Sequence, residues 1–246
     1  MINDCASRMF HGAALARWQA AAVDIGIVAL LNNAQSLGVI VPHGDDETLG
    51  CGGLIALAAA CGVAVTITVL TDGAASHPGS RAWPPARLAA VRRTEVLAAA
   101  ALLTGGTCRV VFAGAPDGNL AGHPQSAALV PPADLYVTCW HGDPHPDHRA
   151  AFAIARAVAT SAPLLAFPLW VLTTPAAVPA LPLLRLDVTA HLAAKRAALA
   201  EHRSQLGALV TDVTGFVVDA ALQALFVRAD ELYLRCPADA ADPAYF

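Results

Sequence analysis

The side chains best suited to chemistry lie in two short clusters, PHGDDE at 42–47 and HGDPHPDH at 141–148. They are His43, Asp45, Asp46, Glu47, His145, Asp147 and His148. A histidine and a carboxylate three positions apart, completed by a distant histidine, provide the ligands of a catalytic zinc site, in which a fourth position stays open for water. The two clusters therefore predict a catalytic metal centre, which divalent ions other than zinc could also occupy.

Two other interpretations of these residues involve no metal. Asp45 or Asp46 could cap a helix that starts near Glu47, and Asp147 could cap the next helix. One acid is enough for a cap, however, and burying the remaining polar groups without a partner would cost several kcal/mol. The glycines of GCGG at 50–53 could approach a phosphate, although the glycine order of the dinucleotide-binding fingerprint is absent. Metal binding is the leading interpretation, and helix capping is its alternative.

Alternating strands and helices must position the two clusters. Short apolar runs predict strands at Leu37–Pro42, Val63–Leu70, Cys108–Ala113, Leu135–Trp140 and Leu164–Val171. Helical periodicity predicts helices at Leu49–Ala60, Leu88–Leu103 and about Asp147–Ala159. This alternation indicates an α/β fold, with a mostly parallel sheet covered on both faces and ligands at the carboxyl ends of the strands. The two clusters follow the first and fourth strands, so they line one crevice if those strands are adjacent.

The composition of the chain argues against nucleic-acid binding and against a membrane-spanning segment. The 246 residues are 56% hydrophobic and 14% charged, with a formal net charge of -4, and Lys195 is the sole lysine. A nucleic-acid partner is therefore not expected. The apolar runs are interrupted by Asp24 or by prolines before they reach the ~18 residues of a membrane span.

The chain is expected to form one domain over 1–246, with a core at about 37–205 and an N-terminal helical extension at 1–36. The six cysteines form no CxxC pair and several lie in apolar runs, as is typical of reduced thiols. The N-terminus lacks the basic head and cleavage site of a signal peptide. A cytoplasmic location is expected, and the oligomeric state is left open, a homo-oligomer included.

The motifs PHGDDETLGCGG at 42–53 and HPDH at 145–148 resemble the paired motifs of the PIG-L/LmbE-like zinc-dependent N-deacetylases. TDG at 71–73, RRTE at 92–95, APDGNL at 115–120 and KRAALAEHRSQ at 195–205 resemble other segments of that family, in the family's order. The resemblance covers roughly residues 37–205. It implies an LmbE-like fold, a Rossmann-like three-layer sandwich, and removal of an acetyl group from an N-acetylglucosamine-type or related amino sugar, either small or lipid-linked.

The resemblance also implies roles for individual residues. It assigns zinc to His43, Asp46 and His148, the general base to Asp45, oxyanion stabilisation to His145, and the support of His145 to Asp147. Zinc would lower the pKa of bound water from 15.7 to around 7, and the base would then take the proton of that water. Glu47 is expected to support the following helix or the ligands.

Substrate contacts are the least constrained prediction. Arg81, in the loop after TDG, could clamp hydroxyl or carboxylate groups, and Asp143 could contact substrate, support a metal ligand or only shape the turn before Pro144. Two departures from the family pattern stand out: Gly44 replaces a proline, and Asp143 replaces the tyrosine of some members. A zinc amidohydrolase acting on a non-sugar acyl-amine is the alternative function. A non-catalytic sugar- or nucleotide-binding domain is the third, but a binding domain has no need of a base beside a metal ligand.

Overall fold

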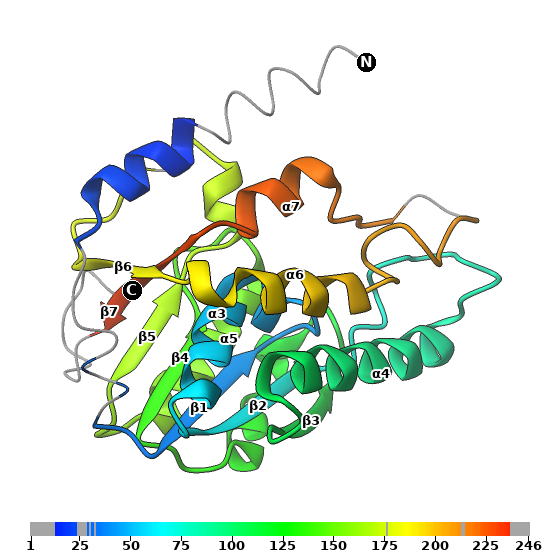
Figure 1. Cartoon of the computed structure of the whole chain (residues 1–246). Helices are drawn as coiled ribbons and strands as arrows, with labels where there is room; N and C mark the ends of the chain where they lie inside the picture. Colours follow the sequence, from blue (N-terminus) through cyan, green and yellow to red (C-terminus); the bar gives the residue numbers. More distant parts are fainter. Residues whose placement is uncertain are drawn as a thin grey trace.

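The structure is a computed structural model, and it describes residues 13–23, 29, 31, 33–175, 177–212 and 215–236. These residues build a 7-stranded sheet in the order β3-β2-β1-β4-β5-β7-β6 (Figure 1). The strands from β3 to β5 are parallel, whereas β7 runs antiparallel to both β5 and β6. The strand bounds are β1 Ser36–Val41, β2 Ala64–Thr71, β3 Arg109–Ala115, β4 Leu135–Cys139, β5 Leu164–Phe167, β6 Leu183–Asp187 and β7 Asp230–Cys236.

Helices cover both faces of the sheet. The crossovers from β1 to β2 and from β4 to β5 run in opposite directions across the sheet, so right-handed connections place their helices on opposite faces. α3 packs with α4 and α6 on one face, and α5 packs against β4 and β1 on the other. No helix in the described residues is long and apolar enough to cross a membrane. The helix bounds are α3 Asp46–Ala60, α4 Pro85–Thr104, α5 Pro146–Val158, α6 Leu192–Glu201 and α7 Ala220–Phe226.

The predicted α/β fold is confirmed, because all five predicted strands and all three predicted helices are present. The fifth strand is shorter than predicted, since β5 ends at Phe167 before Pro168 and a short 3-10 helix, η3, occupies Trp170–Thr173. β6, β7 and α7 were not predicted. Residues 13–21 are helical and Val23 pairs with Leu184, whereas residues 1–12, 24–28, 30 and 32 of the expected N-terminal extension lie outside the described residues.

The glycines at 50–53 serve the packing of α3. A Cβ on Gly50 would lie 2.2 Å from the ring of Phe167, and a Cβ on Gly53 would lie 2.5 Å from Val188. Real Cβ atoms do not approach neighbours so closely, so larger residues would push α3 away from the elements around it. Close packing explains this run, and the phosphate-binding alternative is not needed.

α3 is interrupted at Cys51, where the backbone is not helical (φ -144°, ψ 22°). A buried polar cluster, the Lys195–Glu231 cluster, satisfies backbone groups on both sides of this interruption. Glu231 accepts hydrogen bonds from the N–H groups of Gly53 and Leu54 at 2.7 and 2.9 Å, and Lys195 Nζ donates to the Leu49 carbonyl at 3.0 Å. Lys195 Nζ also lies 2.6 Å from Glu231 Oε1, and Tyr233 donates to Glu231 Oε2 at 2.7 Å. The cluster therefore joins α3, α6 and β7.

Candidate active site

A cavity of about 380 Å³ lies where the two sequence clusters meet. β1 and β4 are adjacent and parallel, with Ile40 opposite Thr138, so the segments that follow both strands meet at one edge of the sheet. The cavity lining includes His43, Asp45 and His145. The predicted shared crevice is present, at the position where open α/β sheets bind ligands.

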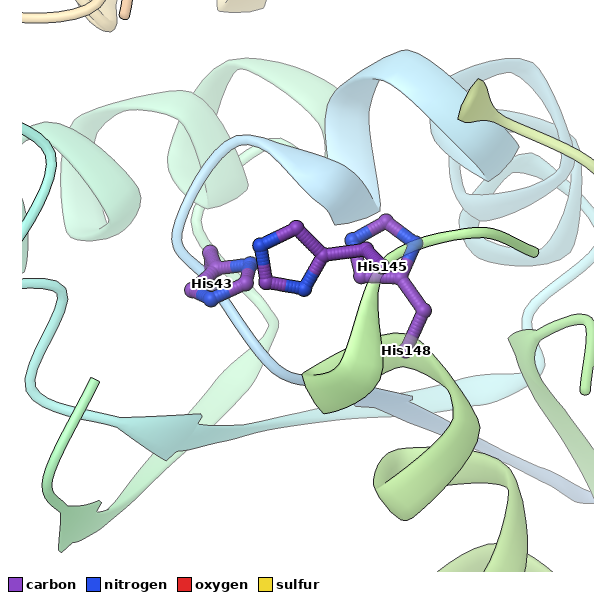
Figure 2. A group of neighbouring side chains, drawn as sticks. All are labelled: His43, His145 and His148. Carbon is purple, nitrogen blue, oxygen red and sulfur yellow. The ribbon is translucent and has the colours of Figure 1, made fainter. Parts of the chain in front are cut away.

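The three predicted metal ligands converge on one carboxylate oxygen. Asp46 Oδ2 lies 3.2 Å from His43 Nδ1 and 3.4 Å from His148 Nε2. Figure 2 shows the rings of His43, His145 and His148 side by side, and the His43 and His148 centroids are 5.7 Å apart. The turn after β1 supplies His43, the first residue of α3 is Asp46, and the first turn of α5 supplies His148. Two distant segments thus contribute to one ligand set.

The donor atoms of this set fit a divalent cation. His148 is 0% exposed, yet neither of its ring nitrogens makes a hydrogen bond, although carboxylate oxygens lie 3.3 and 3.4 Å away. Leaving a buried polar group without a hydrogen bond costs about 1–3 kcal/mol. A metal ion would use the nitrogen that faces Asp46, and two imidazoles with one carboxylate suit zinc.

The charges around His43 also favour a bound cation. Burial alone would lower the pKa of His43, but the carboxylates of Asp117, Asp147 and Asp46 outweigh burial and raise it to about 10. His43 Nε2 lies 3.1 Å from Asp117 and 3.3 Å from Asp147. Burial would raise the pKa of Asp46, but the neighbouring histidines, His148 first, hold it well below its ordinary value. Negative charge is therefore concentrated here, and it favours a cation.

Asp45 lies beside this set and faces the cavity. Its carboxylate is 3% exposed and lies 3.3 Å from Arg92 Nη2. Burial raises the pKa of Asp45 above its ordinary value, Asp46 raises it further, and Arg92 opposes the shift. A carboxylate with a raised pKa is better suited to accept a proton near neutral pH. The position and environment of Asp45 therefore fit a general base.

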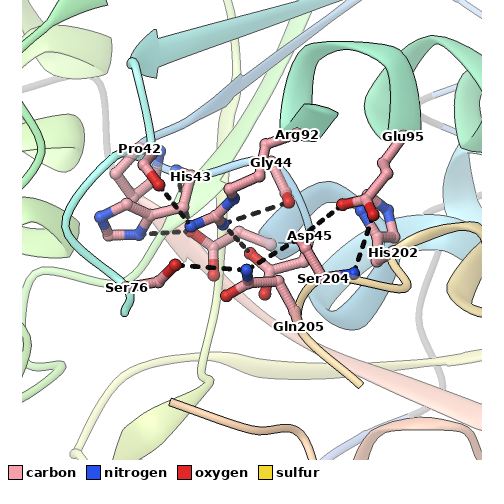
Figure 3. A network of polar contacts seen from close by, with 12 residues as sticks. Pro42, His43, Gly44, Asp45, Ser76, Arg92, Glu95, His202, Ser204 and Gln205 are labelled. Atoms are coloured by element: carbon pink, nitrogen blue, oxygen red, sulfur yellow. Dashed lines mark hydrogen bonds and ion pairs between the residues drawn. The ribbon is translucent and has the colours of Figure 1, made fainter. Parts of the chain in front are cut away.

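Arg92 contacts three groups of the site. Figure 3 shows its side chain beside Asp45 and Gly44. Besides Asp45, it donates to the carbonyls of Gly73 and Gly44 at 3.1 and 3.3 Å. Arg92 and Glu95 lie three positions apart on α4, yet each has a different partner. Glu95 instead accepts hydrogen bonds from the N–H and hydroxyl of Ser204 at 2.8 and 2.6 Å. Arg92 is thus part of the site, and Glu95 joins α4 to the segment after α6.

The contact expected between the Asp147 carboxylate and His145 is replaced by another arrangement. The Asp147 carboxylate accepts from the N–H groups of Gly118 and Leu120 at 2.7 and 3.0 Å and faces His43. His145 is held by the backbone N–H of Asp147, which donates to His145 Nδ1 at 3.2 Å. Because α5 begins at Pro146, the Asp147 N–H lies in the first turn and has no acceptor within the helix. This bond assigns the proton of a neutral His145 to Nε2.

The surroundings of His145 also shift its pKa. Burial lowers the pKa of His145, and the neighbouring His43 and His148 lower it further. This environment favours the neutral ring. A neutral ring with its proton on Nε2 still offers one hydrogen-bond donor beside the cavity.

Asp143 lies beneath the site. It is 1% exposed, its Oδ1 lies 3.3 Å from His148 Nδ1, and its Oδ2 accepts from the Trp170 N–H at 2.8 Å. Of the alternatives for Asp143, this position fits the support of a metal ligand and leaves no free face for substrate. Such carboxylate partners orient the histidines that bind metals.

Arg81 does not reach the site in this structure. It is exposed, it is not among the residues that line the cavity, and its backbone N–H donates to Asp212 at 2.9 Å. The predicted substrate clamp has no structural support. Glu47 is fully buried and lies 2.9 Å from His202 Nε2, which agrees with its expected supporting role.

Several cavity residues were not singled out from the sequence. Asp117 lies in the APDGNL segment and Gln205 in KRAALAEHRSQ, whose resemblance could have identified them, whereas Ser76, Trp170 and Phe216 carry no local motif. Buried Cys139 at the end of β4 has its sulfur within 4.8 Å of ligand atoms of Asp46 and His148, and burial raises the pKa of its thiol to about 12. Long-range folding alone brings these side chains to the cavity.

Comparisons with known proteins place this site in context. Residues 38–159 match the family described as PIG-L: GlcNAc-PI de-N-acetylase. The fold is similar to that of an N,N'-diacetylchitobiose deacetylase from Pyrococcus horikoshii, with a TM-score of 0.64 and 19% identity over 87% of this chain and 88% of that chain. It is also similar to the A40926 pseudoaglycone deacetylase Dbv21, with a TM-score of 0.62 and 21% identity over 85% and 99% of the two chains.

The same fold also occurs with other chemistry. GalB, the 4-carboxy-2-hydroxymuconate hydratase of Pseudomonas putida KT2440, has a TM-score of 0.54 and 20% identity over 85% of this chain and 98% of that chain. No curated protein sequence matches this chain. The same fold therefore hosts different reactions, and the residues of the site determine which reaction occurs.

Proposed function

We propose that this chain is a metal-dependent N-deacetylase that acts on an amino sugar, as the match of residues 38–159 to the family described as PIG-L: GlcNAc-PI de-N-acetylase supports. One observation carries the proposal: Asp46 Oδ2 joins two buried histidines, His43 and His148, at the edge of a cavity that Asp45 also lines. A ligand set with an adjacent unligated carboxylate is the arrangement that metal-assisted hydrolysis requires.

His43, Asp46 and His148 would hold the metal ion, with zinc as the leading candidate. When bound there, the ion supplies Lewis acidity toward the acyl oxygen and toward water. Asp143 holds His148 from behind, and the Asp147 carboxylate does the same for His43. Both supporting carboxylates keep the imidazoles in fixed orientations.

Asp45 takes the proton of the attacking water, since it is next to the ligand Asp46, lines the cavity and is not needed as a ligand. Arg92 fixes its orientation through the 3.3 Å ion pair. His145 Nε2 donates a hydrogen bond to the oxygen on which negative charge develops, and one such donor is typically worth about 3–4 kcal/mol. Asp45 then returns the proton to the leaving amine, which departs poorly without it.

The cavity supports a sugar-sized substrate. Its volume of about 380 Å³ falls near the lower end of ligand-binding pockets, roughly 300–1,000 Å³. Asp117, Ser76 and Gln205 supply donors and acceptors that suit hydroxyl groups. Two proteins with similar structures, a chitobiose deacetylase and a pseudoaglycone deacetylase, support amino-sugar derivatives as the class to test first.

The experiment is release of a primary amine from N-acetylglucosamine, N,N'-diacetylchitobiose and a set of N-acetyl amino acids by the metal-loaded protein. The proposal expects turnover of at least one N-acetyl sugar and its loss in Asp45→Asn. Turnover of the amino acid conjugates alone would overturn the sugar assignment in favour of the acyl-amine alternative. Absence of amine release from every compound, with metal bound, would overturn the deacetylase proposal.

A further inference from the structure

One side of the cavity is built from aromatic rings. Trp170 and Phe216 both line it, and their ring centroids are 5.2 Å apart at an interplanar angle of 77°. Buried Phe226 packs behind Trp170 with centroids 5.5 Å apart. We call Trp170 and Phe216 the aromatic wall. The mechanism above uses neither ring, so the wall needs another explanation.

The Trp170 side of the wall is fixed to the metal site. Asp143 Oδ2 accepts the Trp170 N–H at 2.8 Å, while the other oxygen of Asp143 lies 3.3 Å from His148. The backbone turn that carries the indole is therefore held by the same carboxylate that supports a predicted metal ligand. This link sets the position of the ring relative to the reacting centre.

The Phe216 side is fixed to the loop across the cavity. The Phe216 N–H donates to the Ser76 carbonyl at 3.1 Å, and Ser76 itself lines the cavity. A Cβ on Gly215 would lie 2.2 Å from His77, so glycine permits this close approach. A preformed wall loses little conformational freedom when a ligand binds.

The wall continues outward from the cavity. Phe216 and its neighbour Val217 are each 37% exposed, which makes them two of the few large apolar side chains in the described residues that face solvent. Ser76, Arg92 and Asp117 give the cavity a polar part as well. A substrate that fills it therefore presents polar groups in one part and an apolar face in another.

We propose that Trp170 and Phe216 form a subsite for an aromatic group attached to the amine-bearing unit of the substrate. This subsite rests on the proposed deacetylase function for the reaction itself. It adds the chemical nature of the group that is attached to the amine-bearing unit. Edge-to-face contact with Trp170 and Phe216 favours a flat ring, because aromatic pairs gain energy beyond their buried area. Two such contacts correspond to about tenfold tighter binding.

The first test measures binding without turnover. Calorimetry compares phenyl β-glucoside with methyl β-glucoside, neither of which carries an acetamide, so hydrolysis plays no part. The phenyl compound is expected to bind about tenfold more tightly, and Phe216→Ala is expected to remove that advantage. Leu129→Ala, which removes another exposed apolar side chain outside the cavity lining, is the matched control and keeps it. Equal affinity for the two glucosides, or no binding of the phenyl compound, would overturn the subsite.

A second measurement separates aromatic from alkyl groups. Octyl β-glucoside offers apolar area without a ring, and it is expected to bind more weakly than the phenyl compound. Trp170→Phe keeps an aromatic ring and retains most of the preference, whereas Trp170→Leu loses it. Stronger binding of the octyl compound would overturn the aromatic assignment.

The third measurement distinguishes this proposal from the deacetylase proposal. With phenyl and methyl N-acetyl-β-glucosaminides, Phe216→Ala is expected to raise KM for the phenyl substrate about tenfold and to leave kcat within twofold. If neither substrate releases amine but the phenyl glucoside still binds more tightly, the subsite stands and the deacetylase proposal fails. If both substrates are hydrolysed with equal KM, the deacetylase proposal stands and the subsite fails.

Discussion

α3 contacts two buried polar clusters that differ in how completely their groups are paired. In the Lys195–Glu231 cluster, Glu231 accepts from two backbone N–H groups, Lys195 and Tyr233, all within 2.9 Å. In the crevice around Asp46, the nitrogens of His148 make no hydrogen bond and the Arg92 Nε has no acceptor. The Lys195–Glu231 cluster finds its partners within the fold, whereas the crevice has ligand atoms that converge on one point and can accept a further partner.

Unpaired atoms alone do not distinguish the crevice. Trp18 Nε1 and Thr138 Oγ1 are also buried without hydrogen bonds, yet they lie among apolar neighbours. The crevice differs because nitrogen and oxygen ligand atoms from separate segments lie within 4.8 Å of one another next to a cavity. Convergence of ligand atoms, rather than incomplete pairing, indicates the functional site.

The largest expected effect is on turnover in the crevice. Asp45→Asn removes the general base and is expected to lower kcat by about 10²–10⁴ while metal content stays at the wild-type value. The free energy of unfolding is expected to fall as well, because the variant leaves the buried Arg92 guanidinium without its carboxylate partner, and circular dichroism checks that the protein assayed is folded. Asp219→Asn, at the start of α7, is the control and should keep wild-type turnover. Loss of metal in Asp45→Asn would instead identify Asp45 as a ligand.

The next largest effect concerns the paired cluster. Lys195→Met leaves the Glu231 carboxylate buried without its cation and is expected to lower the free energy of unfolding by about 3–5 kcal/mol. Denaturant titration measures this loss. Metal affinity of the folded protein should stay the same, since the cluster does not line the cavity. A variant of wild-type stability would show that the ion pair is not needed to hold α3.

A smaller effect is expected where the crevice is supported from behind. Asp143→Asn weakens the hold on His148 and should reduce metal affinity by about 10–100-fold, the range found for carboxylates that orient metal-binding histidines. Competition with a chelator measures the change. Unchanged metal affinity together with a raised KM would restore the original interpretation of Asp143 as a substrate contact.

The smallest effect is expected outside both clusters. Arg81→Ala removes an exposed side chain that does not line the cavity, so kcat/KM for an N-acetyl sugar should change by less than about twofold. Steady-state kinetics with the best substrate of the panel provides the check. A large rise in KM would mean that the loop moves Arg81 into the cavity when substrate binds.

The sequence was sufficient to predict the features that depend on local pattern. Apolar runs located the strands, and the clusters after β1 and β4 located the crevice, because the carboxyl ends of adjacent parallel strands meet. The spacing of His43 and Asp46 indicated a pair of metal ligands. This pattern is also local, since both residues lie where β1 passes into α3.

Features that depend on distant contacts could not be predicted in this way. The Asp147 carboxylate faces His43 and the N–H groups of Gly118 and Leu120 instead of His145. Trp170 lies in η3 and not in the predicted longer strand, because the chain turns after Phe167 and Asp143 binds the turn. The antiparallel edge formed by β6 and β7 has no local signal that specifies its partners.

The most direct test of the account is calorimetric titration of metal-free protein with zinc, for the wild type and for Asp46→Asn. The account predicts about one ion bound per chain in the wild type, a rise in thermal stability on binding, and much weaker binding in the variant. Absence of binding in the wild type, or equal affinity in Asp46→Asn, would contradict the claim that the crevice around Asp46 is completed by a metal ion.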